Sequence, residues 1–134
     1  MKQQNFIHFY SFMKTVPDMY YAMPKFLFKE EFDCLSAEAK MLYTCLLDRL
    51  TLAVKENWKD EEDRLYVYYT IAQATKVLGV SKNTAHKAFV ELKDIGLIDV
   101  IRQGHCKPSK ILVKTVMPAI DYEKHRLKVW ESED

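Results

Sequence analysis

Residues 70–96 read TIAQATKVLGVSKNTAHKAFVELKDIG, and this stretch decides the fold. Thr70 and Gln73 have the spacing of a capping box, in which each side chain satisfies a backbone N–H that the first helical turn leaves unpaired. This spacing predicts a helix over 71–78. Gly79 follows directly, and glycine ends helices because it adopts the left-handed backbone conformation without strain.

A second helix is predicted directly after this turn. Ser81 is its expected N-cap and Gly96 its expected C-cap. Its apolar side chains recur at helical spacing, as on the buried face of a helix: Ala85, Ala88, Phe89, Leu92 and Ile95. Two helices joined by a short turn with a glycine are typical of the helix-turn-helix unit, whose second helix enters the major groove of DNA.

The flanking segments extend this unit into a larger fold. Ser36 is an expected N-cap, and the apolar spacing behind it predicts a helix over 36–53. The β-branched and aromatic run 65–69 predicts a short strand. The β-rich runs 97–101 and 111–113 flank a basic loop. Helix, strand, helix, helix, strand, loop, strand is the order of a winged helix, so we expect an α+β winged helix-turn-helix fold.

The composition fits one compact domain. The chain has 134 residues, 49% of them hydrophobic, with 3 glycines and 4 prolines, which excludes disordered and collagen-like chains. Its apolar runs are far shorter than the roughly 20 residues of a membrane span. The cysteines are odd in number and lack the spacing of a zinc knuckle or redox pair: Cys34, Cys45 and Cys106. We therefore expect a cytoplasmic protein with free thiols, no cofactor and no membrane contact.

The net charge of +1 hides an asymmetry along the chain. Residues 29–63 contain ten acidic and five basic side chains, whereas residues 76–114 contain eight basic and three acidic ones. The second segment includes the helix-turn-helix and the loop after it. Such a basic region favours an anionic partner such as nucleic acid, although a merely solvated lysine-rich surface has the same composition.

The outward face of the helix over 82–95 carries side chains suited to reading bases. With the apolar stripe toward the core, six positions lie opposite it or on its flanks: Lys82, Asn83, Thr84, His86, Lys87 and Val90. Asparagine pairs with adenine through two hydrogen bonds, lysine or histidine donates to guanine, and an apolar methyl group meets that of thymine. We expect Asn83, His86 and Lys87 to contact base edges.

Phosphate contacts are expected at the start of this helix and in the loop between the last two strands. Ser81, Lys82 and the unpaired N–H groups of the first turn suit phosphate because the positive end of the helix dipole lies there. In the loop, Arg102, Lys107 and Lys110 would add contacts to the DNA backbone or minor groove. Lys110 is alternatively a solvated strand residue.

Other functional sites have little support in the sequence. His105 and Cys106 are adjacent, yet no second pair stands at metal-ligand spacing, so no metal site is expected. The acidic pairs at 30–31 and 61–62 have no histidine or serine arranged for catalysis, and no glycine-rich phosphate loop occurs. We therefore expect a binding protein without enzymatic activity and without a small-molecule substrate.

The first 32 residues hold 9 of the 17 phenylalanine, tyrosine and tryptophan residues of the chain. Residues 26–28 are expected to pack on the helix over 36–53. The remainder predicts two arms of a β-hairpin or strand pair and suits a homodimer interface: Phe6, Phe9, Tyr10, Phe12, Tyr20 and Tyr21. An enlarged core explains the same surplus of aromatic residues, and the two interpretations stay open.

Three motifs are more specific than a generic winged helix requires. They are Pro-Lys-x-Leu-Phe at 24–28, Leu-Asp-Arg at 47–49 and Arg-Gln-Gly-x-x-Lys-Pro at 102–108. Together with the run from Tyr20 to Lys114, they resemble the N-terminal domain of RepA-type plasmid replication initiators of Gram-positive bacteria. This chain departs from the resemblance by having no glycine at 105–106 or near 62–63.

The resemblance implies a winged-helix domain that binds direct repeats, called iterons, in a plasmid origin. It further implies a homodimer that can pair bound origins and so restrain copy number. A separate C-terminal domain, not present in this chain, would meet the host replication proteins. The DNA-reading positions that the resemblance implies are residues 81–87 and 102–110, which the helical spacing and the basic loop also indicate.

These observations predict three segments: an aromatic extension over 1–32, a winged-helix DNA-binding domain over 33–116, and a helical tail or linker over 117–134. We expect the domain of a plasmid replication initiator that binds double-stranded DNA without chemistry. Two rivals remain open. A transcriptional repressor of the same fold would bind one palindrome instead of repeats, and a protein-interaction winged helix would contact partners in a replisome complex.

Overall fold

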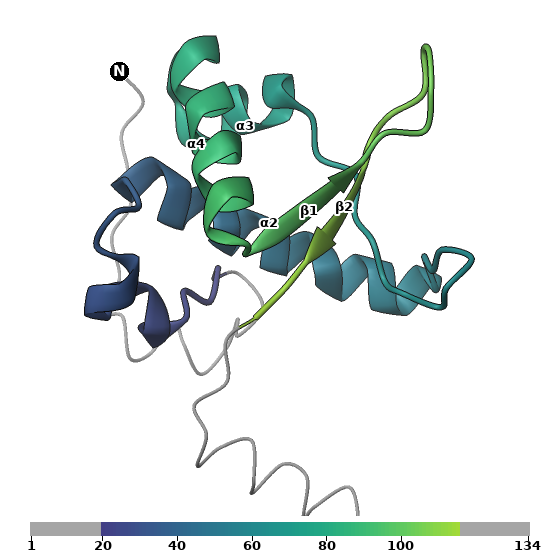
Figure 1. The fold of residues 1–134 in the computed structure, drawn as a ribbon, viewed down its shortest axis with the longest axis horizontal. Coiled ribbons are helices and arrows are strands. Elements are labelled where there is room, and N and C mark those ends of the chain that lie inside the picture. Colours follow the sequence, from purple (N-terminus) through teal and green to yellow (C-terminus); the bar gives the residue numbers. More distant parts are fainter. Residues whose placement is uncertain (1–19, 116–134) are drawn as a thin grey trace, which may run out of the picture.

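The computed structural model describes residues 20–115 (Figure 1). Two short 3-10 helices come first, and three α-helices and a β-hairpin follow: η2 (Lys25–Phe28), η3 (Glu30–Phe32), α2 (Ala37–Glu56), α3 (Ile71–Leu78), α4 (Lys82–Ile95), β1 (Ile98–Ile101) and β2 (Lys110–Val113). This order confirms the predicted α+β fold, with the helix-turn-helix formed by α3 and α4. The predicted N-terminal hairpin falls mainly on residues 1–19, which lie outside the described residues.

The helix ends follow the caps that the sequence predicts. The hydroxyl of Thr70 accepts from the Gln73 N–H at 3.1 Å, and the Gln73 side chain accepts from the Thr70 N–H at 2.9 Å, which completes the capping box of α3. Gly79 (φ 66°) and Gly96 (φ 91°) end α3 and α4 in the left-handed conformation. Local sequence therefore sets where the helix-turn-helix begins, turns and ends.

The hydrophobic core lies where α4 packs on α2 and α3 (Figure 1). The predicted stripe of α4 faces inward: Ala85, Ala88 and Leu92 are buried, and Phe89 and Ile95 are half-buried. Helix α2 contributes three of the largest buried side chains, Leu42, Tyr43 and Leu46. The Tyr43 hydroxyl donates to the Lys114 carbonyl oxygen at 2.6 Å, which ties the end of β2 to α2.

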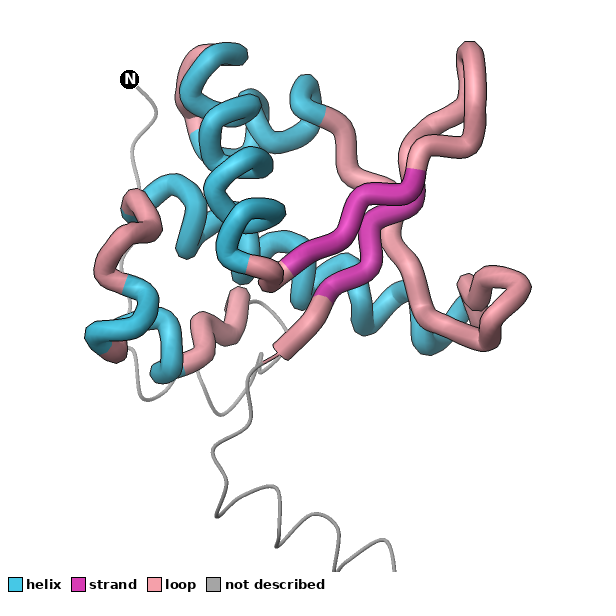
Figure 2. The backbone as a smooth tube through the Cα atoms, viewed as in Figure 1, coloured by secondary structure: helices cyan, strands magenta, loops and turns pink. Residues whose placement is uncertain are grey.

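The hairpin pairs β1 and β2 antiparallel, from Ile98 opposite Val113 to Ile101 opposite Lys110. Figure 2 shows the loop between them, residues 102–109, extending well past the ends of the strands. We call this segment the wing loop. Its tip and the N-terminal end of α4 lie on the same side of the molecule (Figure 1). The wing loop and the outward face of α4 are therefore placed to meet one partner together.

The strand predicted over 65–69 is wrong in extent. Val67 alone in that run pairs with β2, and it exchanges two backbone hydrogen bonds of 2.9 Å with Ile111. A second isolated bridge joins Lys59 and Leu65. The chain turns away on both sides of Val67, because Thr70 must leave the sheet to cap α3 and residues 58–66 fold back on themselves. Aromatic and β-branched content therefore indicated the right place but an overlong strand.

The segment before α2 is part of the core. Leu27 and Phe32 are buried, and the centroid of the Phe26 ring lies 5.7 Å from that of Tyr43. The Phe28 ring is exposed, and Lys40 Nζ of α2 lies 5.5 Å from its centroid. Residues 26–28 therefore contact α2 as predicted. Tyr20 and Tyr21 are exposed and lie in no strand. The other predicted interface residues lie outside the described residues: Phe6, Phe9, Tyr10 and Phe12.

Candidate nucleic-acid interface

Helix α4 turns a polar face to solvent. Its exposed side chains include Lys82, Asn83, His86 and Lys87, together with Val90, whose relative exposure is 39%. Ser81 and Thr84 differ from these residues because their hydroxyls are engaged with each other. Ser81 Oγ lies 2.9 Å from Thr84 Oγ1 and accepts from the Thr84 N–H at 3.2 Å. The predicted N-cap is thereby confirmed, and these two hydroxyls stabilise the start of α4.

Glu91 holds α4 against α2. Its carboxylate accepts from the Ser36 backbone N–H at 3.1 Å and from the Ser36 hydroxyl at 2.7 Å. The same hydroxyl accepts from the Ala39 N–H at 3.1 Å, which confirms Ser36 as the N-cap of α2. The Glu91 carboxylate lies at the N-terminal end of α2, where a negative charge interacts favourably with the dipole of that helix. A contact between residues 55 positions apart therefore adds to the apolar packing that holds α4 on α2.

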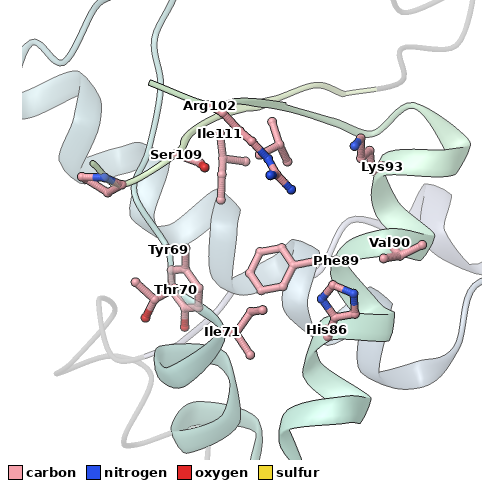
Figure 3. A pocket seen from close by; sticks show the side chains of 12 residues that line it. Tyr69, Thr70, Ile71, His86, Phe89, Val90, Lys93, Arg102, Ser109 and Ile111 are labelled. Carbon is pink, nitrogen blue, oxygen red and sulfur yellow. The ribbon is translucent and has the colours of Figure 1, made fainter. Parts of the chain in front are cut away.

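A groove of about 320 Å³ runs between α4, the start of α3 and the base of the wing loop (Figure 3). We call it the α4–wing groove. Apolar side chains from four segments line it, including Tyr69, Phe89, Val100 and Ile111. Polar and basic residues on its rim come from the start of α3, from α4 and from the wing loop: Thr70, His86, Lys93, Arg102 and Ser109. The groove thus combines an apolar lining with a basic rim.

The charge of the α4–wing groove is not balanced by the protein. No carboxylate lines it, and within residues 20–115 the side chains of Lys93, Arg102 and His86 have no hydrogen-bond or ion-pair partner. Burial raises the pKa of Tyr69 to about 12, so its phenol stays neutral at physiological pH. Unpaired cations beside an apolar surface attract an anion, because nothing in the groove competes for them.

The structure gathers some of the predicted site residues and separates others. His86, Val90 and Arg102 line the α4–wing groove together. Asn83 and Lys87 are exposed outside it, on the neighbouring outward face of α4, and Lys107 is exposed in the wing loop. Lys110 lies elsewhere: its Nζ is 4.7 Å from the centroid of the Tyr66 ring. Lys110 follows the alternation of a strand and points to the face opposite its groove-lining neighbour in β2.

Three rim residues were missed by the sequence analysis: Lys93, Thr70 and Ser109. Lys93 was detectable, because His86, Val90 and Lys93 are spaced by four and three residues and so share one helix face. Nothing comparable identified Thr70 or Ser109. Thr70 was assigned only its capping role, and Ser109 reaches the groove only because the hairpin folds beside α4.

The wing loop is held by neutral contacts. The Gln103 side chain donates from Nε2 to the Pro108 carbonyl oxygen at 2.7 Å, which closes the base of the loop. Gly104 (φ 114°) and Cys106 (φ 64°) take left-handed conformations at its tip. The family resemblance places a glycine at 105–106. Cys106 stands there and has the left-handed backbone conformation that glycine adopts without strain. No basic side chain of the loop is used to hold its shape.

Within residues 20–115, no helix has the length and apolar character needed to cross a membrane. The same part of the chain has no cluster of three histidine, cysteine or acidic side chains that could hold a metal ion. The three cysteines are free thiols.

The sequence of this chain is similar to a protein family and to a protein of known sequence. Residues 19–126 match the family described as replication initiator protein A (RepA) N-terminus. A "41 kDa protein" of Lactobacillus helveticus is 30% identical over 106 residues, which are 78% of this chain and 30% of that protein. The chain thus spans about a third of the length of that relative.

Solved structures with the same fold include two that concern DNA. An "N-terminal domain of DNA binding protein" has a TM-score of 0.67 and 26% identity, and covers 94% of this chain and 95% of its own. A "structure of Rep-DNA complex" has a TM-score of 0.66 and 26% identity, with coverages of 92% and 95%. A "structure of MDR initiator" has a TM-score of 0.64 and 27% identity, with coverages of 97% and 99%.

Proposed function

We propose, from the premise that this chain belongs to the replication initiator protein A N-terminal family, that it is the DNA-binding part of a plasmid replication initiator. The observation that carries the proposal is the set of unpaired basic side chains on one side of the molecule. They extend from the N-terminal end of α4 to the wing loop: Lys82, Lys87, Lys93, Arg102 and Lys107. A similar structure described as a Rep–DNA complex supports it.

In this proposal the N-terminal half of α4 enters the major groove of double-stranded DNA. Asn83, His86 and Lys87 are exposed there and contact base edges, while Lys82 contacts phosphate. The Ser81 and Thr84 hydroxyls keep the helix start in shape. Arg102 and Lys107 approach the neighbouring backbone or minor groove from the wing loop. Binding itself needs no cofactor and no bond-making step, so the domain acts without enzymatic activity.

The biological target proposed is an array of iterons in a plasmid origin. Homodimers would occupy the repeats, with the exposed Tyr20 and Tyr21 side chains at the interface. Pairing of two occupied origins would then limit copy number, and a C-terminal domain would recruit the host replication proteins. A chain with these partners works in the cytoplasm, where plasmid DNA is found.

The first experiment selects binding sequences from a random duplex pool with the wild-type chain and measures affinity by fluorescence anisotropy at several salt concentrations. Asn83→Ala should cost about 1–3 kcal/mol at one base position and relax the preference there. Lys82→Ala should weaken binding to all sequences and reduce the slope of log Kd against log salt by about 1. Lys55→Ala, which removes an exposed charge at the far end of α2, is the matched control and should change neither.

The arrangement of the selected site discriminates the rival functions. Tighter binding to direct repeats than to an inverted pair supports the initiator, whereas the reverse preference supports a transcriptional repressor. If the wild-type chain binds no duplex at any salt concentration, the proposal is wrong. A protein-interaction winged helix then becomes the better explanation, with the exposed Val90 as the first residue to mutate.

A further inference from the structure

We infer that the α4–wing groove seats a sugar–phosphate segment of one DNA strand, with a single phosphate held between Lys93 and Arg102. This inference rests on the proposed DNA-binding function and adds a binding site to it. Lys93 is absent from the set of DNA contacts predicted from the sequence, and the inference assigns both Lys93 and Arg102 to one phosphate.

The position of the groove is what a DNA strand requires. When α4 lies in the major groove and the wing loop approaches the adjacent minor groove, the sugar–phosphate backbone that separates those two grooves must pass between them. The α4–wing groove is the hollow at that place, lined by both elements (Figure 3). A protein surface without such a hollow would hold the backbone away from one of its two contact elements.

The lining of the groove matches the two chemical parts of a backbone segment. Phe89, Val100 and Ile111 offer an apolar surface to the C–H groups of deoxyribose. Lys93 and Arg102 offer two cations to the phosphate, and guanidinium groups bind phosphate oxygens in pairs. The Ser109 hydroxyl on the rim has no hydrogen-bond partner within residues 20–115 and supplies another donor.

The electrostatics of the groove favour a permanent anion over a neutral base. No acidic side chain lines it, and the neutral phenol of Tyr69 adds no competing charge. Elsewhere in the described part of the chain, several cations already have partners, for example Arg64 with Asp60 and Lys114 with Asp99. Lys93 and Arg102 are left without one, so the gain from binding a phosphate is not offset by the loss of an internal ion pair.

The first test uses Lys93→Ala, Arg102→Ala and the control Lys55→Ala on a duplex selected by the wild-type chain. Each groove variant should weaken binding roughly tenfold and lower the slope of log Kd against log salt by about 1, without changing the preferred sequence. Lys55→Ala should match the wild type. If Lys93→Ala also matches the wild type, the inference is wrong while the proposed function stands.

The second test locates the phosphate. Methylphosphonate, a neutral replacement, is placed at one backbone position of the duplex at a time, and each modified duplex is measured with wild-type and Lys93→Ala chains. One position should weaken binding by the wild type more than it weakens binding by Lys93→Ala, because the Lys93 contact is already absent from the variant and only the Arg102 contact remains to be lost. Full additivity at every position would overturn the inference.

A third variant, Ser109→Trp, fills the groove without removing a charge. It should abolish tight DNA binding while its unfolding temperature stays near that of the wild type. Unchanged affinity in a folded Ser109→Trp chain would contradict entry of the backbone into the groove. If this variant fails to fold, the methylphosphonate series decides. If the wild-type chain binds no duplex, the proposed function itself has failed.

Discussion

Two loops of this molecule are both rich in charge but use it differently. In the turn over 58–66, here the acidic turn, Asp60 accepts from the Arg64 backbone N–H at 2.8 Å and from the Glu62 backbone N–H at 3.0 Å. The Arg64 guanidinium lies 2.9 Å from Asp60 and 3.3 Å from Glu62. In the wing loop, Arg102 and Lys107 have no ion-pair partner within residues 20–115, and Gln103 closes the loop instead.

The contrast teaches how a charged loop is recognised as structural or functional. In the acidic turn, charge holds the backbone in shape, and five of its six ionic side chains, all except Glu61, are engaged with one another or with the backbone. In the wing loop, a neutral amide and the backbone hold the shape, so the basic groups remain free for an external anion. Net charge alone would rank both loops as binding candidates, whereas the pairing within each loop separates them.

The largest expected effect is on DNA affinity, from reversing the charge of the wing loop. The double variant Arg102→Glu, Lys107→Glu should weaken binding on the order of a hundredfold, because two phosphate contacts become repulsive. Its unfolding temperature should stay close to that of the wild type, since neither side chain has a partner to lose. Anisotropy and thermal unfolding on the same preparations measure both quantities.

The matched change in the acidic turn is Arg64→Ala. It should lower the unfolding temperature, because the ion pairs with Asp60 and Glu62 are lost, and leave DNA affinity unchanged. If Arg64→Ala weakens DNA binding as much as the wing variant does, the division between a structural loop and a binding loop is incorrect.

A smaller effect is expected from acidification. The backbone N–H of Arg64, followed by its guanidinium, lowers the pKa of Asp60, so the folded state favours the ionised carboxylate. This contribution to the free energy of unfolding is present above the pKa that Asp60 has in the unfolded chain, and it is lost as the pH falls through the lower folded pKa. Unfolding temperatures measured from neutral to strongly acidic pH should therefore decline less steeply in Asp60→Asn than in the wild type. Parallel curves would show that the contact contributes nothing.

The smallest effect concerns the left-handed positions that both loops contain, Asp63 (φ 63°) and Cys106 (φ 64°). Cys106→Gly should raise the free energy of unfolding by about 0.5–1 kcal/mol, since glycine relieves the left-handed strain that a side chain causes. Asp63→Gly should gain less, because it also loses the 3.4 Å ion pair with Lys59. Chemical denaturation compares the two. A loss of stability in Cys106→Gly would mean that its side chain has an additional structural role.

Local signals in the sequence were sufficient for the helix-turn-helix. The Thr70–Gln73 capping box, the Ser81 cap and the terminal glycines act within a few residues, so their effect does not depend on the rest of the fold. The prediction of a strand over 65–69 was wrong because strand pairing depends on residues that are distant in the chain. Only Val67 pairs with Ile111, and which residues pair depends on where β2 lies.

The same division applies to the candidate site. Helical spacing selected Asn83, His86 and Lys87 as outward residues of α4, and all three are exposed. It could not assign His86 to the α4–wing groove and Asn83 to a different face, because that assignment requires the position of the hairpin. Lys110 shows the limit most clearly: its charge suggested a DNA contact, but its position over the Tyr66 ring could be known only from the fold.

By itself, the sequence determined the order of the three α-helices and the β-hairpin, the caps that start and end the helices, the outward face of α4 and the basic character of the region after residue 76. These properties depend on contacts within one or two helical turns, or on composition. The tertiary structure alone decided that Lys93 and Arg102 line one groove and that the Glu91 carboxylate of α4 accepts hydrogen bonds from Ser36. Such pairs are distant in the chain, and only packing of the core brings them together.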